Sequence, residues 1–298
     1  MIAHLRQRLM EWIAAWYPTA AMDRRPLLAA IWRLLFYALG PEWPFHLRTR
    51  YYDLWAVPRR DHCSRAVLRR GYWERYETEV FRAQLRPGML VADVGANFGH
   101  YSLVAAREIG SDGLVLACEP QPPVRADLER NVALNRAGNI RVLPYAIGER
   151  DGSTAFVVDA YNVGGSSRSV ANVTVVGAQY EVPLRRLATV LAEQCPDRRL
   201  GLLKMDVQGG EASVLDGAWE IIERDRPVVM LEFWPDGLRR AGADPVAVLN
   251  RFGALGYALR LVQEREQRLL PIDNAIDTWP GYNLGPGWQV NLLLVPLP

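Results

Sequence analysis

The stretch VADVGANFGHYSL, residues 91–103, combines the end of an apolar strand with a glycine-containing turn and the start of a helix. Gly95 follows the acidic strand residue Asp93 by two positions, and Gly99 stands directly before the helical pattern. Glycine lets the main chain approach a ligand closely, and a helix N-terminus offers N–H groups that have no partner within the helix. The stretch therefore predicts a ligand-binding turn at the carboxyl end of a strand.

Outward from this turn, short apolar runs alternate with helical patterns as far as residue 297. The strands we expect here are residues 89–95, 113–120, 140–148, 202–207, 227–234, 256–263 and 289–297, with two antiparallel ones at 154–159 and 172–183. Alternating strands and helices predict an α/β fold, a parallel sheet with helices on both faces. Ligands of such sheets bind beyond the carboxyl ends of the strands.

The first 86 residues have a different composition. They carry 15 Arg against 8 acidic residues and 6 of the 10 Trp, whereas the rest of the chain has a net charge of −5. Helical patterns at 2–16, 27–40 and 61–85 predict a helical N-terminal extension, residues 1–86, before a catalytic domain, residues 87–298. The pattern at 27–40 is apolar on all sides but too short to span a bilayer. We expect it to pack on the catalytic domain or on a second copy in a homo-oligomer, or to place residues 1–60 at a membrane surface.

Three cysteines, Cys63, Cys118 and Cys195, lie far apart in the sequence. They form no CxxC pair, which excludes a zinc ribbon and a disulfide scaffold, and we expect no metal site. The N-terminus lacks the layout of a signal peptide, so a cytoplasmic location is expected.

The turn after the first strand of the domain differs from a dinucleotide-binding GxGxxG motif, because Asn97 replaces its second glycine. A carboxylate at Asp93 would repel a pyrophosphate but suits a ligand that carries an ammonium group, such as S-adenosylmethionine. Glu119 follows Gly99 by 20 residues, the spacing of an acid that accepts the ribose hydroxyls of an adenosine cofactor. NAD would use the same acid, so Glu119 alone does not distinguish the two cofactors.

Two further strand ends carry acidic residues. In LLKMDVQGGE, residues 202–211, Asp206 ends a strand and shares a strand face with Lys204, the only lysine; we expect these two to form an ion pair. In VVMLEFWP, residues 228–235, Glu232 interrupts an apolar strand and needs a partner or a ligand. Asp206 is the first candidate for a general base, and His100, directly after Gly99, is the second.

These pieces resemble the FkbM-type methyltransferases, a branch of the class I S-adenosylmethionine-dependent enzymes. The resemblance rests on RPGMLVADVGANFGHYSL (86–103), EPQPP (119–123), LLKMDVQGGEASVLDG (202–217), RPVVMLEFWP (226–235) and NLLLVP (291–296). It implies a Rossmann-like, seven-stranded sheet whose last strand is antiparallel, and S-adenosyl-L-methionine as the cofactor. It also implies a cofactor site of Asp93, Gly95, Asn97, Phe98, Gly99, Glu119 and Asp206.

The chain departs from the family pattern at two places. Gln208 stands where the family usually has Glu, so no acid at 208 serves as a base or metal ligand. LRRL, residues 184–187, replaces a Leu-Asp pair, a change that we expect to affect a helix start.

The resemblance implies O-methylation of a hydroxyl on a sugar, a polyketide or a related small metabolite, with Asp206, His100 and Glu232 as catalytic candidates. Nucleic acid is not the expected acceptor, because a single lysine excludes a Lys-Asp-Lys-Glu tetrad and QGGE replaces a Pro-Pro-aromatic motif. The alternative is an inactive module that docks a protein partner or a membrane surface through its Arg/Trp-rich N-terminus.

Overall fold

The computed structural model describes residues 45–56, 63, 66–67, 72–159, 167–168, 170–273, 275–279, 282 and 287–298. The helices predicted at 2–16 and 27–40 lie outside the described residues, as do most of residues 161–169, for which the sequence predicts a loop between two strands. Of the helix predicted at 61–85, the structure describes α5, Arg75–Gln84.

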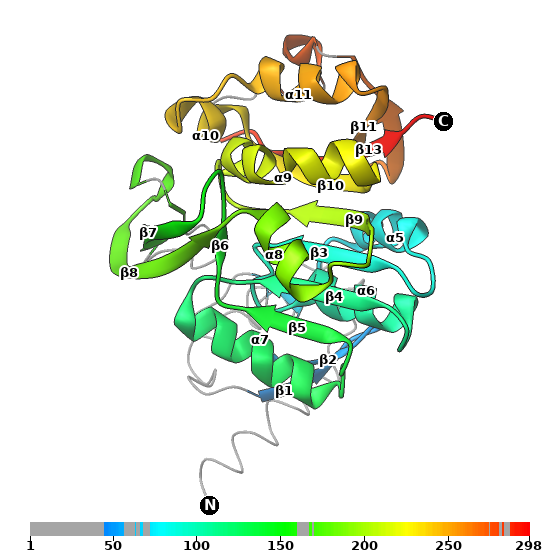
Figure 1. The fold of residues 1–298 in the computed structure, drawn as a ribbon, viewed down its shortest axis with the longest axis vertical. Helices are drawn as coiled ribbons and strands as arrows, with labels where there is room; N and C mark the ends of the chain where they lie inside the picture. The colour runs from blue at the N-terminus through cyan, green and yellow to red at the C-terminus, as the bar shows by residue number, and fades with distance from the viewer. Residues whose placement is uncertain are drawn as a thin grey trace, which may run out of the picture.

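Eight strands form the central sheet in the order β12-β11-β13-β10-β9-β3-β4-β5 (Figure 1). The five from β10 to β5 are parallel to one another, so their carboxyl ends meet at one edge. The bounds are β3 Leu90–Val94, β4 Leu114–Cys118, β5 Ile140–Leu143, β9 Leu200–Met205, β10 Val228–Phe233, β11 Tyr257–Gln263, β12 Arg268–Pro271 and β13 Val290–Pro296.

The last strand confirms one expectation and the strand count corrects another. β13 lies between β10 and β11 and is antiparallel to both, as the family resemblance implies. The sheet has eight strands rather than seven, because the chain turns back after β11 and adds β12 at the edge.

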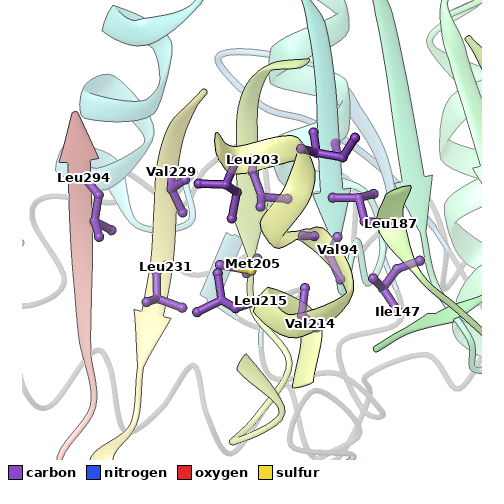
Figure 2. Packing of buried hydrophobic residues seen from close by; sticks show 14 of the residues in the cluster. Val94, Ile147, Leu187, Leu203, Met205, Val214, Leu215, Val229, Leu231 and Leu294 are labelled. Atoms are coloured by element: carbon purple, nitrogen blue, oxygen red, sulfur yellow. The ribbon is translucent and has the colours of Figure 1, made fainter. Parts of the chain in front are cut away.

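Helices cover both faces of this sheet, and side chains that alternate along each strand serve two core layers. In the first layer, Leu294, Leu231 and Met205 of β13, β10 and β9 gather with Leu215 of α9 (Figure 2). In the second layer, Val91 and Leu202 pack with residues of α5 and α6. The other helices are α6 His100–Ile109, α7 Pro122–Leu134, α8 Leu187–Gln194, α9 Glu211–Asp225, α10 Pro235–Arg240 and α11 Pro245–Ala254, with 3₁₀ turns at Val170–Asn172 and Ile276–Thr278.

A second, three-stranded sheet projects beside the carboxyl end of the main one, in the order β6-β8-β7 (Figure 1). Its strands are β6 Ala146–Ile147, β7 Gly152–Asp159 and β8 Val176–Arg185. The strand predicted at 140–148 is thus divided, with β5 in the main sheet and β6 in the small one.

The departure at LRRL falls at a helix start, as expected. Arg186 is the N-cap of α8 and supplies no capping side chain. Instead, the carboxylate of Asp151 accepts the Arg186 N–H (3.0 Å) and the Thr189 hydroxyl (2.8 Å). An acid from a neighbouring turn therefore bonds the start of α8, but it accepts the N–H of Arg186 itself and a side-chain hydroxyl rather than an N–H of the first helical turn.

The structure also contains a feature that the sequence did not predict, a β-hairpin within residues 45–56. It pairs β1 Phe45–Arg48 with β2 Asp53–Ala56. Leu47, Tyr51, Tyr52 and Leu54 are buried and join the second core layer. This part of the proposed N-terminal extension therefore packs against the helices α5, α6 and α7 that cover one face of the sheet.

Candidate active site

The turn after β3 has the left-handed backbone that its residues favour. Gly95, Asn97 and Gly99 have φ values of 82°, 50° and 97°. Asparagine adopts this region more readily than other non-glycine residues, which explains how Asn97 takes the place of a glycine. A Cβ at Gly95 would come 2.0 Å from the carbonyl oxygen of Asp206, so only glycine fits between the ends of β3 and β9.

Glu119, directly after β4, holds this turn with its carboxylate. One oxygen accepts the Asn97 N–H (3.0 Å) and the other accepts the Gln121 N–H (2.9 Å). Burial raises the pKa of Glu119 to about 7, although these two N–H groups lower it. Each oxygen keeps a second lone pair for a ligand hydroxyl.

A pocket of about 650 Å³, partly open to solvent, lies at these strand ends. Gly95, Asn97, Glu119 and Asp206 are the predicted cofactor residues that line it. Sequence reasoning missed its remaining walls, among them Tyr145, Ile147, Phe156, Arg168, Gln208 and Val214. Phe156 belongs to β7, whose closeness to the pocket no motif indicated. Arg168 belongs to GGSSRS, residues 164–169, for which the sequence predicts either a loop that closes over an acceptor or a plain hairpin connection.

Asp93, Phe98, Gly99 and His100 do not line this pocket. The Asp93 carboxylate accepts the Ser102 hydroxyl (2.6 Å) beneath the turn, and burial raises its pKa to about 6 against that hydrogen bond. A Cβ at Gly99 would meet Leu128 at 2.6 Å. Phe98 is buried in the second core layer.

His100 is placed as a structural residue rather than as a base. Nδ1 lies 2.6 Å from the Tyr52 hydroxyl and Nε2 lies 2.9 Å from the Thr78 hydroxyl, so both ring nitrogens are occupied. Burial, aided by the charge of Lys204, lowers the pKa of His100 to about 3. The ring is therefore neutral and closed to an acceptor.

The catalytic candidates Asp206 and Glu232 are brought together. The side-chain amide of Gln208 donates to Asp206 Oδ1 (2.9 Å) and to Glu232 Oε2 (2.6 Å). Burial, the charge of Asp206 and a hydrogen bond with Asp206 raise the pKa of Glu232 well above its usual range. Burial and the neighbouring Asp206 therefore favour the protonated form of Glu232.

Lys204 pairs with Glu77 of α5 (3.6 Å) rather than with Asp206, which corrects the ion pair predicted between neighbours on β9. Its ammonium group also lies 4.7 Å from the centre of the Tyr101 ring. Burial alone would lower the pKa of Lys204, but the carboxylates of Glu77 and Asp206 raise it. The lysine is thus a buried cation among acidic residues.

The remaining bonds of Glu77 join three distant segments. The Tyr101 hydroxyl lies 2.7 Å from a carboxyl oxygen of Glu77 and 2.8 Å from one of Glu74, and the Asn291 amide of β13 donates to Glu77. Burial raises the pKa of Glu77 to about 7, against the effect of Lys204. No sequence signal links Glu77 to a lysine on β9, because the two belong to different parts of the chain.

The segment after β7 is tied to the same place. The carbonyl oxygen of Gln208 accepts the Ser167 hydroxyl (3.1 Å) and the Asn172 amide (3.1 Å). Arg168 bonds the Ser213 hydroxyl (2.6 Å) and forms an ion pair with Glu149 (3.2 Å). These contacts fix one wall of the pocket to α9 and to the strand end that carries Asp206.

The described part of the chain contains neither a candidate metal site nor a candidate membrane-spanning helix. There, no group of three or more His, Cys, Asp or Glu side chains is arranged to hold a metal ion. Nor does any helix described there have the length and apolarity needed to cross a bilayer.

The strand order, the antiparallel β13, the turn after β3 and the acid after β4 together define a class I methyltransferase. The family described as the methyltransferase FkbM domain matches residues 93–259, more than half of the chain. This chain belongs to the FkbM methyltransferase family, and its cofactor is S-adenosyl-L-methionine.

Several known proteins are similar to this chain. Methyltransferase sdnD of Sordaria araneosa is 30% identical over 189 residues, which cover 53% of this chain and 71% of that protein. Methyltransferase 1 of Beauveria bassiana is 26% identical over 153 residues, covering 45% of this chain and 61% of that protein. The crystal structure of Methyltransferase FkbM from Methylobacillus flagellatus has 16% identity and a TM-score of 0.42, covering 73% of this chain and 50% of that one. This chain therefore spans only about half of that solved protein.

The pocket fits the cofactor on its own chemistry. Glu119, at one side, offers lone pairs for the ribose hydroxyls. Tyr145, Ile147 and Phe156 form an apolar and aromatic wall that suits the adenine ring. Asp206 supplies a carboxylate, which suits a ligand with positively charged groups.

Proposed function

We propose that this methyltransferase acts on a hydroxyl group of a sugar, a polyketide or a related small metabolite, with Asp206 as the general base. The observation that carries this proposal is the Asp206–Glu232 carboxyl pair, held by Gln208 beside the cofactor pocket. A hydroxyl is a poor nucleophile until it loses its proton, and a positioned carboxylate accelerates such a transfer by about 10²–10⁴-fold.

The three side chains have separate roles in the proposed reaction. When bound, S-adenosyl-L-methionine supplies an electrophilic methyl group on a positively charged sulfur. Asp206 accepts the acceptor's proton while the oxygen forms its bond to the methyl carbon and the carbon–sulfur bond breaks, its electrons passing to sulfur. Glu232 retains its own proton, and the Gln208 amide keeps both carboxyl groups in place.

The acceptor in this proposal is a small molecule and not a nucleic acid. Its support is the sequence, which lacks both the lysine-rich tetrad and the Pro-Pro-aromatic motif of nucleic-acid methylases. We retain a cytoplasmic location as part of the proposal. Membrane contact through residues 1–60 and a homo-oligomer remain predictions for experiment.

The test is a panel of sugar and polyketide alcohols, together with their amino analogues, incubated with methyl-¹³C-labelled S-adenosyl-L-methionine. We expect an O-methyl signal by NMR, and the Asp206→Asn variant should keep its fold and still bind the cofactor but lose at least about 10²-fold in turnover at saturating cofactor. Products with N-methyl groups only would contradict the hydroxyl assignment. Cofactor binding without turnover on any acceptor would favour the inactive binding module.

Full activity in Asp206→Asn would remove this residue from the role of base. Asp216→Asn, an exposed change on α9, is the matched control and should leave turnover unchanged.

A further inference from the structure

Two chains of hydrogen bonds connect the cofactor turn to the hairpin of residues 45–56. The hairpin lies outside residues 93–259, the part of the chain that matches the family. The connections end at Phe98 and His100, which flank Gly99 on either side.

The first connection passes through the imidazole of His100. The Thr78 hydroxyl donates to the carbonyl oxygen of Glu74 (2.7 Å), so its oxygen is left to accept the Nε2–H of His100 (2.9 Å). Nδ1 then carries the lone pair, and the Tyr52 hydroxyl of the hairpin donates to it (2.6 Å). The contacts thus fix both the tautomer and the orientation of the ring.

The second connection passes through Asn131 of α7, which is fully buried. Its amide donates to the carbonyl oxygen of Phe98 (2.9 Å), and its oxygen accepts the N–H of Trp55 in β2 (2.8 Å). Asn135, one turn later, bonds the main chain of Asp53 through both N–H and C=O (2.8 and 2.6 Å). Asn135 therefore holds the same hairpin, but it bonds Asp53 and Asn131 and not the cofactor turn.

The turn needs such support because of its backbone. Gly95, Asn97 and Gly99 all have positive φ, and glycine in particular has many other conformations open to it. A ligand that had to order this turn on binding would lose affinity, whereas a turn ordered beforehand avoids that cost.

We propose that the hairpin preorganises the cofactor turn, with Tyr52 and Asn131 as positioning residues that act through His100 and Phe98. The inference concerns cofactor affinity, and it goes beyond the proposed acceptor and base. It assigns part of the segment outside the family domain to the binding function.

The chain offers a matched pair of variants, Tyr52→Phe and Tyr51→Phe. Both tyrosines are buried neighbours in the hairpin, but the Tyr51 hydroxyl donates to Glu79 of α5 (2.5 Å) and not to the turn. Isothermal titration of the full chain with S-adenosylhomocysteine should show affinity lowered about tenfold in Tyr52→Phe and within about twofold of wild type in Tyr51→Phe. Likewise, Asn131→Ala should lower the affinity for S-adenosylhomocysteine more than Asn135→Ala does.

Amide hydrogen exchange of the ligand-free proteins separates positioning from a general loss of stability. In Tyr52→Phe we expect faster exchange at residues 96–102, with the strands β3, β4 and β9 unchanged, and S-adenosylhomocysteine at saturation should restore the slow exchange. Equal affinity in both tyrosine variants, or exchange that is faster throughout the sheet, would overturn the proposal. Wild-type protein that binds no S-adenosylhomocysteine would contradict the cofactor assignment, but the exchange comparison would still decide whether the hairpin orders the turn.

Discussion

Glu119 is the residue whose removal should most directly weaken cofactor binding. Its buried carboxylate holds Asn97 and lines the pocket. A charged hydrogen-bonding group contributes about 1.5–3 kcal/mol, so Glu119→Ala should bind S-adenosyl-L-methionine about 10–150-fold more weakly by isothermal titration. Glu129→Ala, an exposed change on α7, is the control. Unchanged affinity in Glu119→Ala would refute the ribose assignment.

The buried carboxyl group of Glu211 should make the free energy of unfolding depend on pH. It is fully buried, Oε1 accepts the Gly209 N–H (2.9 Å), and no described group hydrogen-bonds Oε2. Burial raises its pKa to about 7, so the folded protein keeps this proton after the unfolded chain has lost it near pH 4.3. This group therefore lowers the free energy of unfolding as pH rises from about 4.5 to 7.

The Glu211→Gln variant lacks this titration. Between pH 5 and pH 8 it should gain stability relative to wild type, by an amount on the order of 2–3 kcal/mol. Urea unfolding at the two pH values measures the difference, with Glu220→Gln on the exposed face of α9 as control. If the free energy of unfolding of wild type and of Glu211→Gln changes equally with pH, Glu211 does not have the raised pKa that we assign to it.

The sequence predicted part of the site and missed the rest for a physical reason. Gly95, Asn97, Glu119 and Asp206 each end or follow a strand, and parallel topology brings such positions together. The counter-ion of Lys204 is Glu77 on α5, far away in the sequence, and no periodic pattern predicts that the two residues are in contact. Likewise, the sequence marks Gln208 as a departure from the family, but only the fold shows that its amide joins two carboxyl groups.

Among the elements, β3, β4, β9 and β10 were predictable because each is a mainly apolar run that is almost entirely buried. The edge strand β12 was missed, since its four residues are only partly buried or exposed. The hairpin at 45–56 was not, since its two strands have four residues each and their aromatic residues fit no clear period. The strand predicted at 140–148 was too long, because the chain leaves the main sheet at Pro144.

The start of α8 depends on a side chain outside the helix. Asp151→Ala removes the acceptor of the Arg186 N–H and the Thr189 hydroxyl. A hydrogen bond contributes about 0.5–1.5 kcal/mol and these two are exposed, so the midpoint of urea unfolding should fall slightly. Asp197→Ala, an exposed change in the turn after α8, should have no measurable effect. A midpoint that is equally unaffected in Asp151→Ala would show that these two hydrogen bonds do not stabilise the start of α8.

For the whole molecule, the test of the N-terminal segment is deletion. Removing residues 1–60 takes Leu47, Tyr52 and Leu54 out of the second core layer and exposes apolar surface. We expect aggregated protein by size-exclusion chromatography, whereas deletion of residues 1–44 keeps the hairpin. If residues 1–60 serve instead as a membrane contact, the shorter protein will stay folded but will no longer co-sediment with anionic vesicles. Both predictions would be contradicted if the protein without residues 1–60 is soluble and fully active and the full chain does not co-sediment with anionic vesicles.

The position of β13 has a consequence for how the chain is made. β10 and β11 leave the ribosome before β13, yet β13 is the strand that lies between them. Until residues 290–296 emerge, β10 has an unpaired edge, and such edges readily pair with other chains. The emerging chain also lacks Asn291, the amide that bonds Glu77 of α5. Translation that pauses before this strand should therefore leave a nascent chain that depends on chaperones, even though nearly all of the catalytic residues have already been synthesised.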